Sequence, residues 1–385
     1  MALEVPRSIR GGGTTPLAPA NIPKRAARAP NGRLNGLRVV VAGAGAIGSC
    51  LALRLRDEGV EVLLADAAPL GANASGVAAG MLAPAFETVL DPPAAGHFEL
   101  LRTARELWPA LAGRVGGTLD RSGALWAGDE ASNAEVLERL TLRGARAEAV
   151  DAARARGLSP GLEAPQGAVF TPEDWTLDPA GMLASLRGAF EAAGGRVRAA
   201  AVTSWSGGTA GLSDGGEARA DVLVLAAGLA AEGLASPPPE LAHLQPIKGQ
   251  ILSLDAMEPR AGPVARGEGI YVVARASGPT AGATMQAGVR DLAIDPATVA
   301  ALRSAAARLY PALAGARATA RAGVRATSPD GLPLAGPSLT TGAWLAMGAR
   351  RNGWLLAPLI AEVVAARLAG GDGGALARLF DPGRF

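Results

Sequence analysis

A glycine-rich turn between an apolar strand and a helical segment constrains this chain more than any other feature. Gly43, Gly45 and Gly48 form the pattern G-x-G-x-x-G at the end of the apolar run LRVVVAGAG, which starts at Leu37. In such a pattern the first glycine allows a tight turn, the second lets the backbone approach a pyrophosphate, and the third allows close packing of helix on strand. The sequence therefore predicts a dinucleotide-binding unit.

The segments on both sides of the turn support that prediction. AIGSCLALRLRDEGV has apolar residues at helical spacing, and VEVLLAD is a second buried strand that ends at Asp66. A carboxylate in that position can accept hydrogen bonds from ribose hydroxyls. The start of the helix, at Ala46 and Ile47, offers N–H groups and a positive dipole end to phosphates. The pattern does not distinguish FAD from NAD.

Few side chains here can carry out demanding chemistry without a cofactor. The 385 residues include one cysteine, Cys50, and two histidines, His97 and His243, which we expect to be structural. An intramolecular disulfide is impossible, and zinc sites or Cys/His nucleophilic sites are nearly excluded. We therefore expect no metal, a cytoplasmic location and an organic cofactor that supplies the difficult step.

The length of the chain predicts more than one domain. Residues 1–36 are rich in glycine, proline and arginine without apolar periodicity, so we interpret them as a disordered leader. No run of eighteen apolar residues occurs, and no membrane span is expected. Apolar patterns predict helices at 97–113, 131–143, 178–194, 296–309 and 353–369, and strands within 196–228, 245–254 and 269–289.

Six later segments together resemble one known family. They are GANASGVAAGMLAPAFE (71–87), PIKGQILSL (246–254), IYVVAR (270–275), GATM (282–285), AGVRATSPDGLPLAG (322–336) and GARRNGWLLAP (348–358). Each resembles a block of the D-amino-acid oxidase and glycine oxidase family, and the blocks occur in the same order. The resemblance covers 37–370 and implies an α/β fold, with a Rossmann-type FAD-binding domain and a smaller antiparallel-sheet substrate domain.

By that resemblance the FAD-binding domain is discontinuous and comprises 37–95, 165–240 and 322–385, while 96–164 and 241–321 form the substrate domain. FAD would bind non-covalently. Its predicted contacts are Gly43, Gly45, Ala46, Ile47, Gly48, Asp66, Ala67, Ala74, Ser75, Ala79, Gly80, Met81, Val202, Gly228, Ala349, Arg350, Asn352, Gly353, Trp354 and Leu355. The small residues among them leave room for a flat ring, and they also suit an ordinary packing interface.

Four residues are predicted to contact an amino-acid substrate. Arginine binds carboxylates through two parallel N–H groups and stays charged at any working pH. Arg325 resembles the family's carboxylate-binding arginine and Arg351 a second substrate-contacting arginine; for each, a buried ion pair is the alternative. Tyr271 resembles a substrate-binding tyrosine and Met285 a pocket-lining residue, although both also suit ordinary core positions.

The resemblance implies a FAD-dependent oxidase that converts glycine, sarcosine or small D-amino acids to imino acids, reduces O2 to H2O2 and feeds thiamine thiazole synthesis. It also implies a homotetramer without nucleic-acid or membrane partners. Two departures from the family pattern occur: Ala349 and Arg350 replace a histidine–aromatic pair, and Ala326 replaces a proline.

Three other interpretations stay open. One is a D-amino-acid dehydrogenase with a quinone acceptor. Another is a FAD-dependent oxidoreductase that modifies the wobble uridine of tRNA; the arginine-rich leader would favour it, and the lack of a methyltransferase domain would count against it. The third is a non-catalytic flavin-binding protein, against which Arg325, Tyr271 and Arg351 argue.

Overall fold

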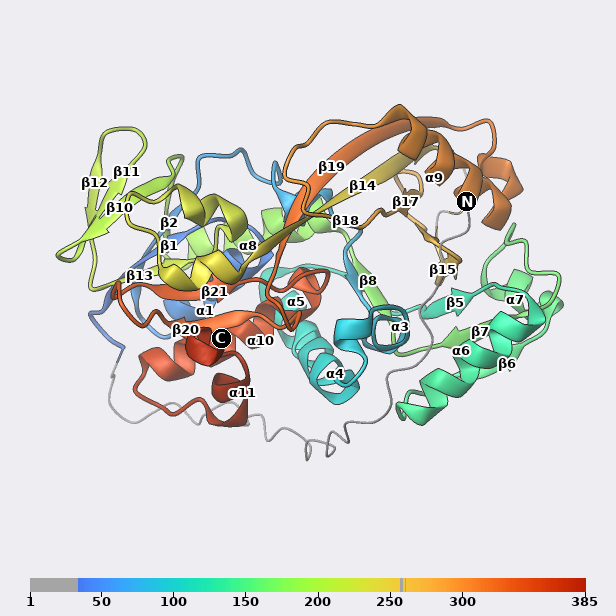
Figure 1. Cartoon of the computed structure of the whole chain (residues 1–385), viewed down its shortest axis with the longest axis horizontal. Helices are drawn as coiled ribbons and strands as arrows, with labels where there is room; N and C mark the ends of the chain where they lie inside the picture. The colour runs from blue at the N-terminus through green and yellow to red at the C-terminus, as the bar shows by residue number, and fades with distance from the viewer. Residues whose placement is uncertain (1–33, 257–258, 260) are drawn as a thin grey trace.

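Two large β-sheets lie toward opposite ends of the molecule, and a long pair of strands joins the two halves (Figure 1). The computed structural model describes residues 34–256, 259 and 261–385. The predicted leader, 1–36, lies almost entirely outside the described residues. Within the described part of the chain, no helix is long and apolar enough to cross a bilayer.

The first sheet contains the dinucleotide-binding unit. Its strand order is β20 (Leu334–Pro337), β21 (Trp344–Met347), β13 (Val222–Leu225), β1 (Arg38–Ala42), β2 (Glu61–Ala65) and β9 (Arg196–Arg198). All neighbouring pairs are parallel except β20 and β21, and β1 lies between β2 and β13. Helix α1 (Ala46–Asp57) packs against α8 (Pro179–Ala192) and α10 (Gly353–Leu368) in a shared apolar core.

The second sheet is built around the long antiparallel pair β14 (Gln245–Asp255) and β19 (Arg317–Thr327). Its other strands are β5 (Ala124–Trp126), β6 (Glu148–Val150), β7 (Ala168–Thr171), β15 (Val264–Gly267), β16 (Ile270–Val273), β17 (Thr280–Gly282) and β18 (Gln286–Ala287). Helix α9 (Pro296–Leu309) packs on β14 and β16 and closes a separate apolar core.

Shorter elements connect and cover these sheets. One small sheet joins β3 (Met81–Leu82), β8 (Trp175–Leu177) and β4 (Leu119–Asp120), and another joins β10 (Val202–Ser206), β11 (Thr209–Leu212) and β12 (Glu217–Arg219). The remaining helices are α2 (Ala74–Val77), α3 (Pro84–Leu90), α4 (Phe98–Glu106), α5 (Trp108–Val115), α6 (Glu130–Leu142), α7 (Ala152–Leu158) and α11 (Gly374–Leu379). The described residues also form the 3-10 helices η1 (Pro92–Ala94), η2 (Gly228–Gly233), η3 (Pro239–His243), η4 (Pro311–Leu313) and η5 (Pro382–Arg384).

The predicted fold class is confirmed, and most predicted helices are present as α6, α8, α9 and α10. Asp178 caps α8 by accepting a hydrogen bond from the Gly181 N–H, with Pro179 at the first helical position. The prediction of one helix over 97–113 is wrong, because the chain breaks between α4 and α5 at Leu107. Pro109 lacks an N–H and cannot continue the hydrogen bonds of the preceding helix.

The boundaries of the two domains stay predictions. Helices α4 and α5, which we assigned to the substrate domain, pack against α10 and α8 in the core of the first sheet. Strand β19 spans the predicted boundary at 322.

Candidate active site

Two glycines in the turn between β1 and α1 have no room for a side chain. Gly43 has a φ of +107°, and a Cβ at this residue would lie 2.7 Å from the backbone of Ala226. A Cβ at Gly48 would lie 1.9 Å from the Gly43 carbonyl oxygen. Backbone atoms cannot move aside as a flexible side chain can, so these two positions require glycine.

Two side chains fix the turn from outside. Ser75 Oγ accepts a hydrogen bond from the Ala46 N–H at 2.9 Å. Asp66 accepts from the Ala44 N–H at 2.7 Å and the Ala68 N–H at 2.9 Å, so its carboxylate also organises the turn.

The start of α1 suits a phosphate group. Its N-cap, Gly45, supplies no side chain to the helix end. Among the described residues, no acceptor bonds the N–H groups of Ile47 and Gly48. Unpaired N–H groups at a helix N-terminus bind anions. The turn therefore fits the pyrophosphate of a dinucleotide such as FAD.

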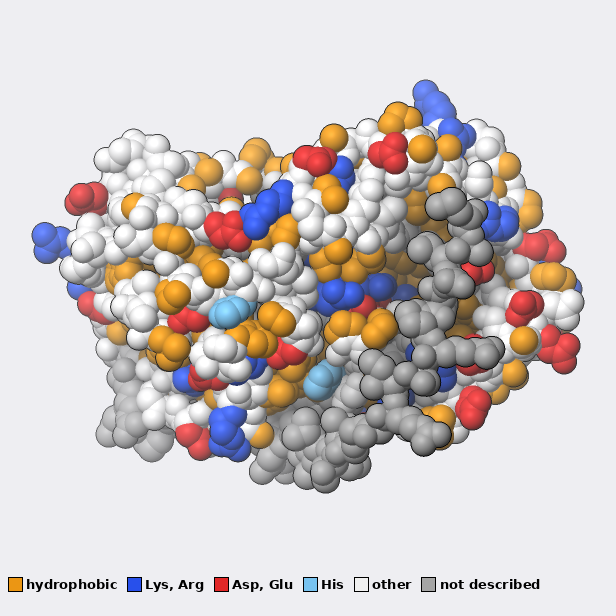
Figure 2. All heavy atoms as spheres, in the orientation of Figure 1, with side chains coloured by type: hydrophobic (Ala, Val, Ile, Leu, Met, Phe, Trp, Pro, Cys, Tyr) orange, Lys and Arg blue, Asp and Glu red, His pale blue; other side chains and the backbone are white. Residues whose placement is uncertain are grey.

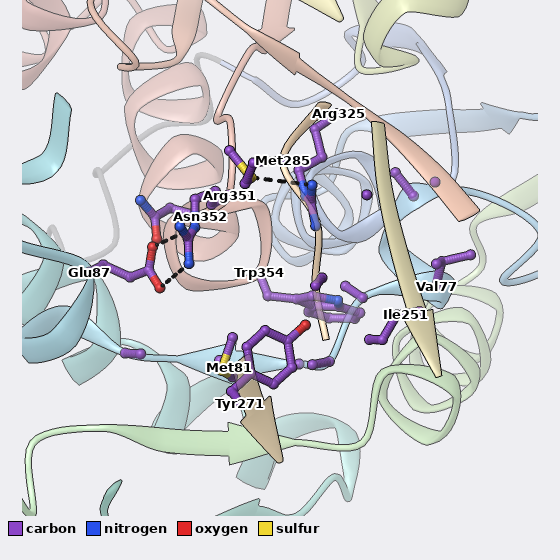
Figure 3. Close-up of a pocket in the computed structure, with 18 residues that line it drawn as sticks. Val77, Met81, Glu87, Ile251, Tyr271, Met285, Arg325, Arg351, Asn352 and Trp354 are labelled. Atoms are coloured by element: carbon purple, nitrogen blue, oxygen red, sulfur yellow. Dashed lines mark hydrogen bonds and ion pairs between the residues drawn. The ribbon is translucent and has the colours of Figure 1, made fainter. Parts of the chain in front are cut away.

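A pocket lies beside this turn (Figure 3). Its wall is formed mainly by β14, β16 and β19 of the second sheet, by α2, β3 and α3, and by the segment after β21. The space between its lining residues, about 720 Å³, includes a part that is open to solvent. Figure 2 shows the corresponding face of the molecule hollowed between its two halves, with basic and apolar side chains visible in the hollow. The Trp354 indole N–H donates to the Ser75 carbonyl at 3.0 Å and so links the pocket to the glycine turn.

The structure brings many of the predicted residues together in the pocket wall. They are Ala74, Ala79, Gly80, Met81, Tyr271, Met285, Arg325, Arg351, Asn352 and Trp354. The other predicted FAD contacts lie outside this wall: Gly43, Gly45, Ala46, Ile47, Gly48, Asp66, Ala67, Ser75, Val202, Gly228, Ala349, Arg350, Gly353 and Leu355. Gly228 follows the Ala226–Ala227 backbone that contacts Gly43, and Val202 lies in β10. Their contacts with FAD stay predictions.

Arg325 extends from β19 into the pocket and has no carboxylate partner among the described residues (Figure 3). Its Nη1 lies 3.4 Å from the Thr284 carbonyl and 3.5 Å from Met285 Sδ, which are weak contacts for a charged donor. A Cβ at Gly249 would lie 2.4 Å from Nη1, so the glycine on β14 makes room for the guanidinium. Burial, together with the charge of Arg351, lowers the pKa of Arg325.

Arg351 forms the buried ion pair that was the alternative to substrate binding. Its Nη2 donates to Glu87 Oε1 at 3.2 Å, and its Nε lies 3.0 Å from Glu87 Oε2. The Glu87 carboxylate raises the pKa of Arg351. Arg350 is paired as well, because its Nε and Nη2 donate to the two oxygens of buried Asp91 at 2.9 and 2.8 Å.

Tyr271 on β16 places its hydroxyl at the pocket. A Cβ at Gly282 would lie 3.2 Å from that oxygen, and no described residue hydrogen-bonds to it. Burial raises the pKa of the phenol, which therefore stays protonated near neutral pH and can donate a hydrogen bond.

Glu87 lines the pocket, and the sequence motifs did not reveal it as a candidate site residue. It is located on α3, whose N-terminus is fixed by Asp174: the carboxylate of Asp174 accepts from the Ala85 and Phe86 N–H groups at 2.8 and 3.2 Å. Arg266 Nη1 lies 3.7 Å from Glu87 Oε1. The sequence feature that could have pointed to Glu87 is an acidic residue at the end of block 71–87, whose other residues are mostly small or apolar.

Comparisons with known proteins agree with this architecture. A family model described as FAD dependent oxidoreductase matches residues 38–367. The tRNA 5-methylaminomethyl-2-thiouridine biosynthesis bifunctional protein MnmC of Maricaulis maris is 32% identical over 338 residues, which are 86% of this chain and 52% of that protein. The chain thus spans about half the length of this relative.

Two further relatives match over nearly their whole length. The putative thiamine biosynthesis oxidoreductase ThiO of Rhizobium etli is 31% identical, and the match covers 86% of this chain and 96% of that protein. The crystal structure of glycine oxidase from Geobacillus kaustophilus superposes with a TM-score of 0.78 at 25% identity and covers 91% of this chain and 99% of that structure.

Proposed function

The chain belongs to the FAD dependent oxidoreductase family, and from this premise we propose that it oxidises the amine of glycine or of a similarly small amino acid, with O2 as the electron acceptor. One observation carries the proposal. Arg325 points into the pocket as a half-buried guanidinium without a carboxylate partner among the described residues, so a substrate carboxylate is its natural partner. The glycine oxidase of Pseudomonas aeruginosa, which is 28% identical over 86% of this chain, has a name that indicates this kind of substrate.

The residues that would hold FAD follow from the geometry of the turn. The N–H groups of Ile47 and Gly48 would bind the pyrophosphate, and Asp66 would bind a ribose hydroxyl with its remaining lone pairs. The small residues of 74–80 and the Asn352–Trp354 segment would hold the ring system. When bound, FAD supplies the two-electron acceptor for amine oxidation. Cys50 is buried in α1, which is consistent with a non-covalent cofactor.

The pocket side chains bind and orient the substrate. Arg325 would hold the carboxylate through two N–H groups, and the Tyr271 hydroxyl would donate a second contact. Fixing the acid group at one end of a small substrate determines where its α-carbon and amine lie. The ionisable groups of the described pocket are Glu87, Tyr271, Arg325 and Arg351, and none is placed as a free base, because Glu87 is already paired. The amine would therefore lose its proton before it binds.

The overall reaction consumes an amino acid, O2 and water and yields the 2-oxo acid, ammonia and H2O2. With glycine, the first product is an imino acid that could enter thiazole synthesis for thiamine, as the name of the ThiO relative suggests. We propose a cytoplasmic homo-oligomer for this role.

The test is a substrate profile of the purified protein. We expect a yellow, FAD-containing protein that forms peroxide in air with glycine, sarcosine or D-alanine. A colourless protein would contradict the cofactor assignment. Dye reduction under nitrogen without peroxide in air would indicate instead a dehydrogenase, the activity named for a relative that is 35% identical over 167 residues.

A second candidate is favoured by the 32% identity to MnmC. A carboxymethylaminomethyl group on uridine is an N-substituted glycine, so the same arginine could bind its carboxylate. Salt-sensitive binding of tRNA, together with turnover of the modified nucleoside but not of free glycine, would favour this candidate.

A further inference from the structure

The carboxylate of Glu87 is the charged group of the pocket that the proposed reaction does not use. Glu87 is only 3% exposed, yet it lines the pocket. Its Oε2 lies 3.0 Å from Arg351 Nε without the alignment of a hydrogen bond, and no other described residue donates to that oxygen. Burying a carboxylate is costly unless its charge is matched, so the surrounding charges indicate its role.

The charges of the pocket wall leave one unmatched cation. Two guanidinium groups, Arg325 and Arg351, and one carboxylate, Glu87, line the space, and Tyr271 is neutral. Arg266 does not line the pocket: it is buried with its Nη1 3.7 Å from Glu87 Oε1, and its charge also acts on the buried carboxylate of Asp174. Glu87 forms an ion pair with Arg351, so of the two guanidinium groups that line the described pocket Arg325 is the one without a carboxylate partner. Figure 3 shows the Arg351–Glu87 pair on one side of the pocket and Arg325 on another. One substrate carboxylate would neutralise the charge of Arg325. A second carboxylate would lie beside Glu87, where no unpaired cation lines the described pocket.

We propose that Glu87 determines specificity by restricting the pocket to amines that carry one carboxylate, because it holds Arg351 in an ion pair and repels a second negative charge. The proposal rests on the proposed function for the class of substrate. It predicts that a neutral residue at position 87 frees Arg351 and admits a dicarboxylate.

A binding experiment tests this without turnover. (Methylthio)acetate and thiodiacetate carry sulfur in place of the amine nitrogen and differ by one carboxylate. Calorimetric titration of the wild-type holoprotein should show (methylthio)acetate binding at least 10-fold more tightly. In Glu87→Gln the preference should shift toward thiodiacetate by roughly 10- to 100-fold, the range of one charge-assisted hydrogen bond.

A kinetic experiment uses the matching amines, sarcosine and iminodiacetate, which is glycine with a second carboxymethyl group on nitrogen. The ratio of kcat/KM for iminodiacetate to that for sarcosine should rise by a similar factor in Glu87→Gln. Glu87→Asp keeps the charge and should keep the wild-type ratio. Glu99→Gln removes a carboxylate that is half exposed on α4, and it should change neither substrate.

The outcomes separate the two proposals. An unchanged ratio and unchanged relative affinities in Glu87→Gln would overturn the specificity role, even if both amines are substrates, because a purely structural residue would lower both in proportion. If the wild-type protein oxidises neither of these amines nor glycine or D-alanine, the proposed function fails, and the titration still decides whether Glu87 excludes a second carboxylate. Should the glutamine variant fail to fold, Glu87→Ala provides the neutral side chain.

Discussion

The glycine turn and the arginine-bearing pocket wall are the two ends of the same candidate site, but they are built from different groups. At the turn, the binding groups are backbone N–H groups, and backbone atoms lie as close as 1.9 Å to the position that a Cβ would occupy. At the pocket, the proposed binding groups are side chains, Arg325 from β19 and Tyr271 from β16, beside the ion pair of Glu87 and Arg351. Gly43 and Gly48 in the turn thus tolerate no side chain, whereas residues of the wall can change while the fold is kept.

The largest effect should come from a methyl group in the turn. In Gly48→Ala the new Cβ meets the Gly43 carbonyl oxygen, so the helix must move off the strand. We expect loss of FAD and a destabilisation of roughly 3 kcal/mol or more, measured by visible absorbance and thermal unfolding. The control is Gly113→Ala in α5, where a Cβ meets nothing within 4 Å and helix propensity should add about 0.5–1 kcal/mol of stability. A yellow Gly48→Ala protein with the wild-type melting temperature would contradict the assignment.

The second-largest effect should come from Arg325 in the pocket wall, and it should leave FAD binding unchanged. Arg325→Ala should lower kcat/KM by about 10²–10⁴-fold, the range for truncating one partner of a buried charge pair, with FAD content unchanged. Arg317→Ala, on the same strand with a side chain that is 90% exposed, is the matched control and should have wild-type kinetics. Equal losses in both variants would mean that the strand, rather than the guanidinium, matters; loss of FAD in Arg325→Ala would assign this residue to the fold.

A smaller effect should be a pH dependence of the free energy of unfolding, and it should come from Asp174, which lies against the start of α3. Burial raises the pKa of Asp174 from 3.8 to about 6. The folded state therefore binds a proton more tightly than the unfolded state, and this contribution is complete below about pH 4 and lost as the pH rises through about 6. The free energy of unfolding of the wild type, relative to Asp174→Asn, should fall by roughly 3 kcal/mol over that interval.

Urea unfolding of both proteins at several pH values across that interval measures the slope. A slope of opposite sign would show that Arg266 and the two N–H groups at the start of α3 stabilise the carboxylate more than burial penalises it.

The two ends of the site also differ in how far the sequence predicts them. Gly43 and Gly48 are required by contacts within a few residues, so their spacing is visible in the chain. The free state of Arg325 and the paired state of Arg351 depend on Glu87, which lies 264 residues from Arg351. A local sequence pattern cannot reveal a contact between residues that are so far apart in the chain. The break at Leu107 was predictable from Pro109, but the apolar periodicity of 97–113 is the stronger pattern and favours one continuous helix.

The order of strands in the first sheet has a consequence for synthesis of the protein. Strand β13 pairs with β1 early in the chain, but its other neighbour, β21, comes only at Trp344–Met347. Helix α1 likewise packs against α10, which comes only at Gly353–Leu368. A nascent chain that has emerged only as far as β13 therefore exposes an unpaired strand edge and an uncovered apolar helix face to other chains. Until β21 and α10 have emerged, the edge of β13 and this face of α1 can associate with other chains.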